Sequence, residues 1–384
     1  IGNNLSGRVD TTLVQAGITS RPIPKLTLYA NFRHEERNDK TPVLTYLTPA
    51  PTTSDGNNEP RSIRTTTGKV EASYALPYAF RLTGGIDYEE KHRNTSPVRI
   101  VSYREETDEW SYRLELRRMM SETLTGSLSY IHSDRDGSPW VTTTVTGGGI
   151  GSNLIAPIHL ADRKRDKVRL LINWTPVAPL TLNFTVDEAR DDYTTRDGST
   201  IGPMDGRAHN YSVDISYAFT QSWQASAWAS YNETKAKQTT CESAASPAGC
   251  PSTATDPTWG AELKNKSNSF GLGFRGKPNG RFELGGDLSY SDIKDTYNQF
   301  PLIPATAAIP TPLPEISTKL TRLNLFGKFL LQKNSGIRLD YIYDRFSTND
   351  WTWSTWMYAD GTRLTQDPTQ KVNFVGLTYY YKWQ

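Results

Sequence analysis

The sequence predicts an all-β protein, a large antiparallel transmembrane β-barrel of the outer-membrane type. Many runs alternate between apolar and polar side chains, so that each run would have one apolar and one polar face. The turns between the runs are alternately short and long, as in barrels with one rim of tight turns and one rim of loops. The chain is also polar for its 384 residues, with only 36% hydrophobic side chains, which suits alternating strands.

The clearest run is the hairpin from Asn210 to Tyr231. Its first strand places the apolar row from Tyr211 to Phe219 on one face, and small or polar side chains on the other. The return strand alternates in the same way after a two-residue turn. A soluble sandwich would bury the apolar face against a second sheet, whereas a membrane barrel would turn it toward lipid and the polar face toward the lumen.

About fifteen runs of this kind recur along the chain. Besides the hairpin they are Leu5–Ser20, Lys25–Asn38, Arg64–Leu76, Phe80–Asn94, Ser102–Met119, Thr123–Arg135, Lys164–Thr175, Leu180–Thr194, Lys264–Gly276, Arg281–Asp295, Ser317–Gln332, Ile337–Arg345 and Gln370–Gln384. Many exceed the roughly 9 to 11 residues that a membrane strand needs, so we expect their ends to project beyond the bilayer. We treat residues 1–384 as one barrel domain.

The direction of the runs predicts that this chain is part of a larger barrel. If the short turns are periplasmic, the first and the last run both point toward the periplasm, which gives an odd number of runs. Bacterial single-chain barrels have an even number of strands. The chain also begins at Ile1 without a signal-like segment. We therefore expect at least one strand to precede Ile1.

Composition excludes several classes of protein. No run approaches the roughly 18 apolar residues of a helical membrane span. The 43 basic and 41 acidic residues give a net charge of +2, which provides no general attraction to nucleic acid. The CxxCH motif is absent, so the chain binds no c-type haem covalently, and we expect it to bind no metal or cofactor itself.

The two cysteines, Cys241 and Cys250, lie in one loop-like stretch. A local disulfide is expected if the compartment is oxidising, and two free thiols are the alternative.

Charged residues that alternate with aliphatic ones in mid-run are candidates for the lumen wall. They are Arg113, Glu115, Arg117, Lys167, Arg169, Arg322, Lys328, Arg338 and Asp340. In a wide barrel they would either hydrate the wall or contact an inserted protein. Trp174, Tyr217, Tyr379 and Trp383 are candidates for an interfacial girdle, because Tyr and Trp suit the boundary between membrane and water.

The sequence contains no nucleophile elbow, phosphate loop or paired metal-ligand spacing, so we expect no enzymatic activity. The five histidines lie near run ends or in loops and are interpreted as rim residues rather than haem ligands. They are His34, His92, His132, His159 and His209. A barrel hydrolase, the enzymatic alternative, would depend on His132 or His209. The acidic run Asp187, Glu188, Asp191 and Asp192 fits either a calcium site or a solvated rim.

Four stretches resemble the decahaem-associated outer-membrane porins of the MtrB/PioB type. They are ANFRHEERNDKTPV at Ala30–Val43, REETDEWSYRLELRRMMSETLTGSLSYIHSDRDGSPW at Arg104–Trp140, DRKRDKVRLLINWTPV at Asp162–Val177 and YADGTRLTQDPTQKVNFVGLTYYYKW at Tyr358–Trp383. The matches spread over nearly the whole chain. Barrels of this family are longer than 384 residues, so the chain resembles the C-terminal part of one. The family's N-terminal Cys-containing motif has no counterpart here.

The resemblance implies a function in the outer membrane of a Gram-negative bacterium. Such a barrel sheathes a periplasmic multihaem c-type cytochrome, which carries the haem, and an extracellular multihaem cytochrome is a further expected partner. Electrons then pass outward to an extracellular acceptor, as in metal respiration, or inward from a donor such as Fe(II). A general or substrate-specific diffusion porin for small solutes shares the same physical features and is the alternative.

Overall fold

A computed structural model describes residues 5–46, 56–94, 103–141, 157–194, 202–241, 258–303, 312–351, 356–357, 363–364 and 367–383. Within these residues fifteen strands form one sheet. They are β1 (Val9–Ile23), β2 (Leu26–Asp39), β5 (Ile63–Ala75), β6 (Phe80–Arg93), β7 (Glu106–Ser121), β8 (Leu124–Gly137), β9 (Arg163–Val177), β10 (Leu180–Tyr193), β11 (Gly202–Thr220), β12 (Trp223–Cys241), β13 (Thr258–Asn279), β14 (Phe282–Ile303), β15 (Ile316–Gln332), β16 (Ser335–Asn349) and β19 (Thr369–Tyr381). The predicted all-β antiparallel architecture is confirmed.

Two small ribbons lie outside this sheet. One pairs β3 (Thr45–Tyr46) with β4 (Gly56–Asn57), and the other pairs β17 (Trp356–Met357) with β18 (Arg363–Leu364). They fall in stretches that the sequence predicted as loops. In the part of the chain that the structure describes, no helix has the length and apolar character needed to cross a membrane.

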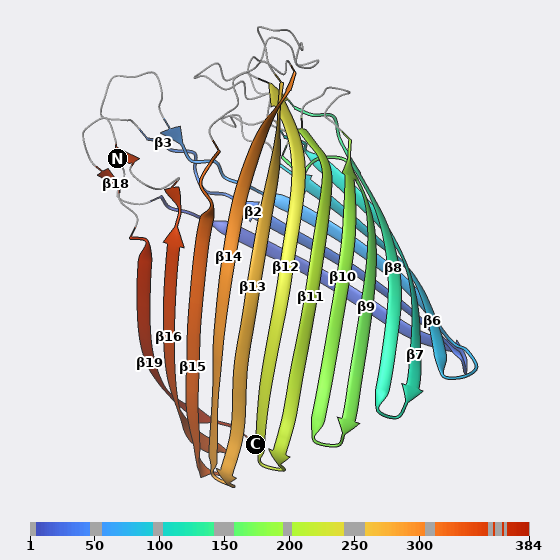
Figure 1. Cartoon of the computed structure of the whole chain (residues 1–384), viewed down its shortest axis with the longest axis vertical. Coiled ribbons are helices and arrows are strands. Elements are labelled where there is room, and N and C mark those ends of the chain that lie inside the picture. Colours follow the sequence, from blue (N-terminus) through green and yellow to red (C-terminus); the bar gives the residue numbers. More distant parts are fainter. Residues whose placement is uncertain are drawn as a thin grey trace.

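Each strand of the sheet pairs antiparallel with its neighbours in chain order. The sheet curves strongly, so that the N-terminal strands pass behind the C-terminal half (Figure 1). Among the described strands, β1 and β19 form the two edges and do not pair with each other. Both strands run from the rim of long connections toward the rim of short turns, so they cannot pair with each other in an antiparallel sheet. The expectation that further strands precede Ile1 stays a prediction.

Several strands continue well beyond the predicted runs. β11 begins at Gly202 rather than Asn210, β12 extends to Cys241, and β13 and β14 have 22 residues each. The reason lies in the outward side chains, which change from apolar to charged beyond Tyr231. The apolar alternation therefore ends while the backbone pairing continues, for example between Lys235 and Lys264.

The apolar side chains form a belt on the outer face of the sheet. Register places Tyr211 opposite Tyr231, and Ile215 opposite Ala227, on the same face. Tyr211, Ile215 and Phe219 are 40%, 38% and 63% exposed, so no second sheet covers this row. The eight steps from Tyr211 to Phe219 span roughly 27 Å along the strand. At a tilt of about 40° this is a height of about 21 Å, close to the roughly 25 Å apolar band of outer-membrane barrels.

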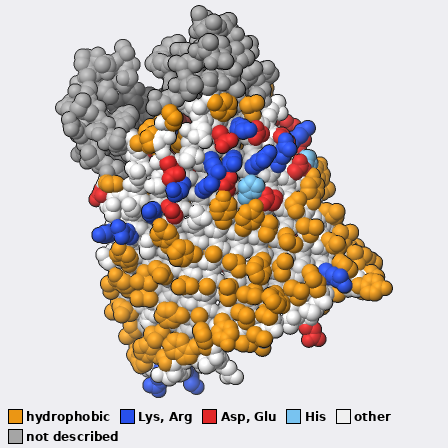
Figure 2. All heavy atoms as spheres, in the orientation of Figure 1, with side chains coloured by type: hydrophobic (Ala, Val, Ile, Leu, Met, Phe, Trp, Pro, Cys, Tyr) orange, Lys and Arg blue, Asp and Glu red, His pale blue; other side chains and the backbone are white. Residues whose placement is uncertain are grey.

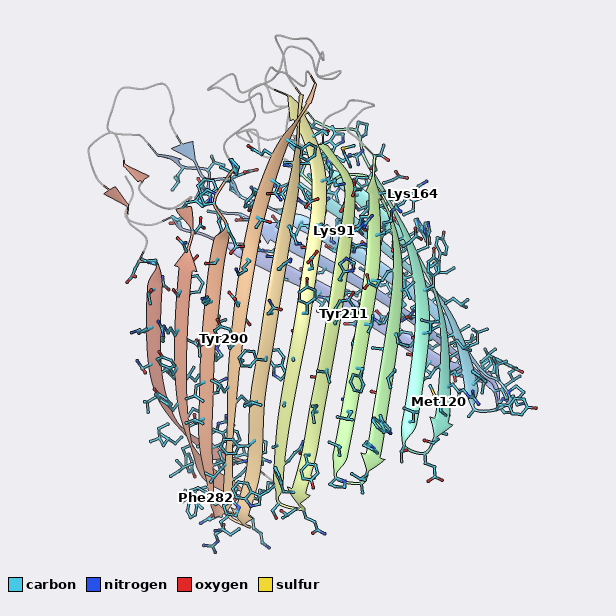
Figure 3. The ribbon with its side chains drawn as sticks, in the orientation of Figure 1. Lys91, Met120, Lys164, Tyr211, Phe282 and Tyr290 are labelled. Atoms are coloured by element: carbon cyan, nitrogen blue, oxygen red, sulfur yellow. The ribbon has the colours of Figure 1, made fainter. Side chains whose placement is uncertain are left out.

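The outer face changes character along the strands. Hydrophobic side chains cover its short-turn half, and Lys, Arg, Asp and Glu gather in the half nearer the long connections (Figure 2). Tyr211 and Tyr290 lie at mid-height, Phe282 lies near the short turns, and Lys164 lies near the long connections (Figure 3). The strands therefore continue past the apolar belt on the long-connection side, as their length predicts.

Candidate functional site on the inner face

The inner face of the sheet carries the polar half of each alternating strand. Cross-strand register assigns residues to this face, because directly opposed residues point to the same side. All nine residues predicted for the lumen wall lie on it. They are Arg113, Glu115 and Arg117 on β7, Lys167 and Arg169 on β9, Arg322 and Lys328 on β15, and Arg338 and Asp340 on β16. Their contact with a partner protein stays a prediction.

Two bidentate ion pairs on the inner wall join β9 to β10, Arg165–Asp191 and Arg169–Asp187. Arg169 donates from Nε and Nη2 to the two carboxylate oxygens of Asp187, at 2.6 and 2.9 Å. The two residues are direct cross-strand partners, and Lys167 Nζ lies 3.3 Å from the same carboxylate. Across β6, Glu71 of β5 accepts a hydrogen bond from Arg113 of β7 and lies 3.3 Å from Lys69. The wall therefore largely neutralises its own charges.

A similar group extends over β15, β16 and β19. Arg322 makes two hydrogen bonds to Asp344, at 2.7 and 2.9 Å, and Arg338 bonds to Asp340 at 2.9 Å. The ammonium group of Lys328 lies 4.9 Å from the centroid of the Tyr380 ring. These side chains remain partly exposed, which is consistent with a hydrated lumen.

Arg81 and Arg117 differ from these inner-wall residues in having no acidic partner within the described chain. They are directly opposed across β6 and β7 near the short-turn rim, both are exposed, and neither makes an ion pair within the described chain. Glu115 on the same face likewise has no ion pair there. Like charges placed opposite each other destabilise a sheet, so this arginine pair is the inner-wall position most able to gain from an anionic guest.

We predict that Asp187→Ala destabilises the folded full-length barrel by about 1–2 kcal/mol, because it leaves Arg169 and Lys167 without their acid. The double variant Asp187→Leu/Arg169→Met should recover most of that loss. Urea unfolding in lipid vesicles measures both. Asp192→Ala is the control, since Asp192 and Arg190 form an exposed pair at 3.5 Å, for which no measurable change is expected. Equal loss in the two single variants would contradict a structural role for the inner pair.

A small packed cluster lies at the long-connection end of the inner face, and no sequence pattern predicted it. We call it the rim cluster; it consists of Tyr103, Arg104, Trp140, Leu160 and Asp162. Leu160 is fully buried, and the guanidinium carbon of Arg104 lies 4.9 Å from the centroid of the Trp140 ring. Arg104 also makes two hydrogen bonds to Asp162 and one to the carbonyl of Leu160 at 3.2 Å. The segment before β9 is thereby attached to the inner wall.

The strand histidines lie on the outer face above the belt, where they contact neighbouring side chains. His34 Nδ1 is 3.1 Å from Thr66 Oγ1, and His132 Nδ1 is 2.8 Å from Asp166 Oδ1. His209 contacts Glu188, and register places His92 on the same face. His159 precedes β9 and lies next to the rim cluster. None of the four strand histidines faces the inner wall.

The acidic run does not form a cation site. Asp187 and Asp191 point inward and bond to Arg169 and Arg165, whereas register turns Glu188 and Asp192 outward. Among the described residues, no group of three or more His, Cys, Asp or Glu side chains could hold a metal ion. The calcium alternative is therefore wrong for these four residues, because successive strand residues face opposite sides.

Three of the residues predicted for the girdle lie on the outer face near the short turns. Trp174 and Tyr217 flank Leu180 and Leu182 of β10, and Tyr379 is opposite Ile337. The fourth, Trp383, follows β19 and packs edge-on against Tyr381 at 4.8 Å between ring centroids. Their role at a membrane interface stays a prediction. The predicted disulfide lies outside the described side chains, because neither the Cys241 side chain nor Cys250 is among them.

Residues 2–383 match the family described as "Putative outer membrane beta-barrel porin, MtrB/PioB". This chain belongs to the MtrB/PioB family of outer-membrane porins. The family resemblance found in the sequence is thereby confirmed, and the location is the outer membrane. Porins are channel or structural proteins rather than enzymes, so the family gives no support to a barrel hydrolase.

Among curated proteins, this MtrB/PioB-family chain is 24% identical over 351 residues to the outer membrane protein MtrB of Shewanella baltica, strain OS185. The match covers 90% of this chain and 47% of the relative, so the chain spans about half the length of that protein.

Solved barrels give weaker likenesses to this family member. A mutant of the ferric enterobactin receptor of Pseudomonas aeruginosa is 8% identical with a TM-score of 0.43, covering 97% of this chain and 70% of the receptor. The copper transporter OprC is 9% identical with a TM-score of 0.43, covering 98% of this chain and 74% of the transporter. Neither likeness indicates what this chain binds or transports.

Proposed function

We propose that this chain forms part of an outer-membrane porin that holds a periplasmic multihaem c-type cytochrome across the membrane and insulates it from lipid. The observation that carries the proposal is the polar inner face, which continues from β5 to β16 behind the apolar belt on the short-turn half of the outer face. The haem would belong to the partner, and the wall would supply position and electrical insulation. An extracellular multihaem cytochrome would receive or supply the electrons beyond the outer rim.

The width of the sheet supports a hollow lumen. Small barrels of about eight strands are filled by their own side chains, whereas sixteen or more leave an aqueous interior. Fifteen strands in one antiparallel sheet require at least one more for even closure. Sixteen strands spaced by about 4.8 Å and tilted by about 40° give a cylinder roughly 30 Å across between backbones.

The size of a folded guest sets a lower limit on the width of the barrel. A folded domain of 100 residues has a radius of gyration of about 13 Å, which corresponds to a sphere about 34 Å in diameter. A guest of that size does not fit inside the minimal sixteen-strand cylinder. A cytochrome sheath therefore requires a full-length barrel with well over sixteen strands.

The balance of charge on the wall also fits a protein guest. Most inner charges are paired with each other, so the wall would not bind a guest tightly at every height. The opposed pair Arg81 and Arg117 and the unpaired Glu115 are left to contact complementary groups. Exposed carboxylates, including haem propionates, are the groups that an arginine pair binds best.

We expect a haem-bearing protein to co-purify with the full-length porin after mild solubilisation of the native membrane. A haem-stained gel and the visible spectrum of the purified complex measure this. A haem-free porin with a large single-channel conductance would contradict the sheath and favour a diffusion porin for small solutes.

Neutralising the arginine pair tests the inner contact separately. The double variant Arg81→Gln/Arg117→Gln should lower the haem-to-porin ratio of the purified complex several-fold in low salt, where the contact between charges is least screened. Heat-dependent gel migration shows whether the barrel stays folded. Arg118→Gln is the matched control, because Arg118 lies one residue away on the outer face, with its guanidinium carbon 4.7 Å from the Phe80 ring centroid. An unchanged ratio in the double variant would remove the arginine pair from the proposed contact.

A further inference from the structure

The outer face of β12 and β13 carries three lysines around one carboxylate, directly above the apolar belt. The ammonium nitrogens of Lys235, Lys264 and Lys266 lie 3.3, 3.3 and 3.6 Å from the carboxylate oxygens of Glu233. Glu233 is 8% exposed and also accepts a hydrogen bond of 2.5 Å from the Tyr231 hydroxyl. We call these three lysines the lysine cluster.

The lysine cluster carries more positive charge than its central acid can neutralise. Among the described residues, Glu233 is the one carboxylate within ion-pair distance of these three lysines, which carry two more positive charges than that acid. Glu262 on β13 and Asp292 on β14 also face outward beside the cluster. Register also places Lys235 directly opposite Lys264, an arrangement of like charges that destabilises a sheet unless an anion compensates it. The neighbouring lysines have other acids, since Lys294 bonds to Glu315 at 2.8 Å and Lys237 Nζ lies 3.9 Å from Asp205 Oδ2.

A shallow apolar hollow lies immediately below the lysine cluster. It has a volume of about 520 Å³ and is lined on the outer face by Phe184, Val213, Ala229 and Phe270, with the stacked rings of Tyr211 and Tyr231 at its upper end. Ala229 leaves the space between the larger side chains of β11 and β13. Glu233 follows Tyr231 by two residues, so the cluster begins roughly 7 Å above the hollow.

We propose that the lysine cluster and this hollow together bind one phosphate-bearing, acylated lipid of the outer leaflet. An acyl chain would lie in the hollow, and its phosphate would accept hydrogen bonds from the lysine ammonium groups, which bind phosphate as point charges. The rim of long connections faces outward in outer-membrane barrels, which places the cluster at the level of the outer-leaflet headgroups. The site is independent of any protein inside the lumen.

The test uses the full-length porin in detergent and diphosphoryl lipid A as the probe, with bound lipid counted by native mass spectrometry. The triple variant Lys235→Gln/Lys264→Gln/Lys266→Gln should weaken lipid retention at least tenfold. The matched control is Lys164→Gln/Lys319→Gln/Lys371→Gln, three outer-face lysines on β9, β15 and β19, which should retain the lipid like the unaltered porin. Heat-dependent gel migration confirms that each variant is folded.

Two further experiments distinguish binding of the lipid from binding of other anions or of a protein partner. Ala229→Phe fills the hollow without changing any charge and should also weaken lipid A retention, while millimolar inorganic phosphate should fail to displace the lipid from the unaltered porin. Equal lipid retention by the triple variant and the unaltered porin would overturn the proposal. So would displacement by inorganic phosphate, or a triple variant that keeps its lipid and loses only an extracellular protein.

Discussion

Replacing Ile215 by arginine is expected to destabilise the folded full-length barrel by about 2–4 kcal/mol, the cost of placing a charged side chain at the middle of a lipid-facing belt. Ile215 lies midway between Tyr211 and Phe219 on the outer face of β11. The neighbouring change Ser216→Arg should cost less than about 1 kcal/mol, because Ser216 points to the polar inner face, where Gln224 donates to its hydroxyl at 2.7 Å.

The two substitutions introduce the same side chain one residue apart, so they differ only in the face of the sheet. Urea titration of the barrel in lipid vesicles gives the free energy of unfolding of each. In micelles of a small detergent the difference between them should shrink, because the arginine then reaches water more easily. If Ser216→Arg is the more damaging change in vesicles, the inner and outer faces have been assigned the wrong way round.

Arg104→Ala is expected to detach the rim cluster while leaving the barrel intact. The Arg104 side chain is 7% exposed and Asp162 is 25% exposed, so the substitution leaves a partly buried carboxylate without its partner, at a cost of about 3 kcal/mol. The Leu160 amide, which donates to the Pro157 carbonyl at 2.9 Å, reports this opening. Its hydrogen-exchange protection should fall roughly 100-fold, since each 1.4 kcal/mol corresponds to a factor of ten.

Arg61→Ala provides the control at the same rim, because Arg61 pairs with Glu59 at 3.1 Å and its side chain is 71% exposed. It should leave Leu160 protected. The variant Arg104→Lys keeps the charge but not the two parallel hydrogen bonds, so its effect should be intermediate. Unchanged exchange of Leu160 in Arg104→Ala would mean that apolar packing alone holds the segment.

Period-two alternation predicted most of the sheet from the sequence. It placed the row from Tyr211 to Phe219 on one face, and it assigned the lumen candidates such as Arg169 and Arg322 to the other face. The tight turns were also recognisable, because short polar pairs separate the runs. These features are local, so a single sequence contains them.

Alternation also explains one failure. Asp187 and Glu188 are adjacent in the sequence and were considered together as a cation site, yet adjacent strand residues point to opposite faces. The strand ends were missed because outward lysines such as Lys235 replace apolar residues there, while the backbone ladder continues unchanged.

Contacts between residues that are far apart in the sequence produce no periodic pattern in it. Arg104 and Asp162 are separated by 58 residues and meet only because β7, β8 and β9 are neighbours in the sheet. The lysine cluster needed the register of β12 and β13, which aligns Lys235 with Lys264 across the connection between the strands. The sequence alone predicts well which face of the sheet a residue occupies. Which residues meet across two strands can be predicted only once the register of those strands is known.

The length of β13 has a consequence for the proposed cytochrome sheath. Its 22 residues extend roughly 75 Å along the strand and, at a tilt of about 40°, rise about 55 Å. The hydrocarbon layer is about 30 Å thick and the bilayer with its headgroups about 40–45 Å, so about 10–15 Å of this height stands in water beyond the bilayer. The wall would therefore also shield the part of an enclosed redox carrier that lies outside the membrane from dissolved oxidants. Such a carrier could exchange electrons with its surroundings only at the two open ends of the barrel.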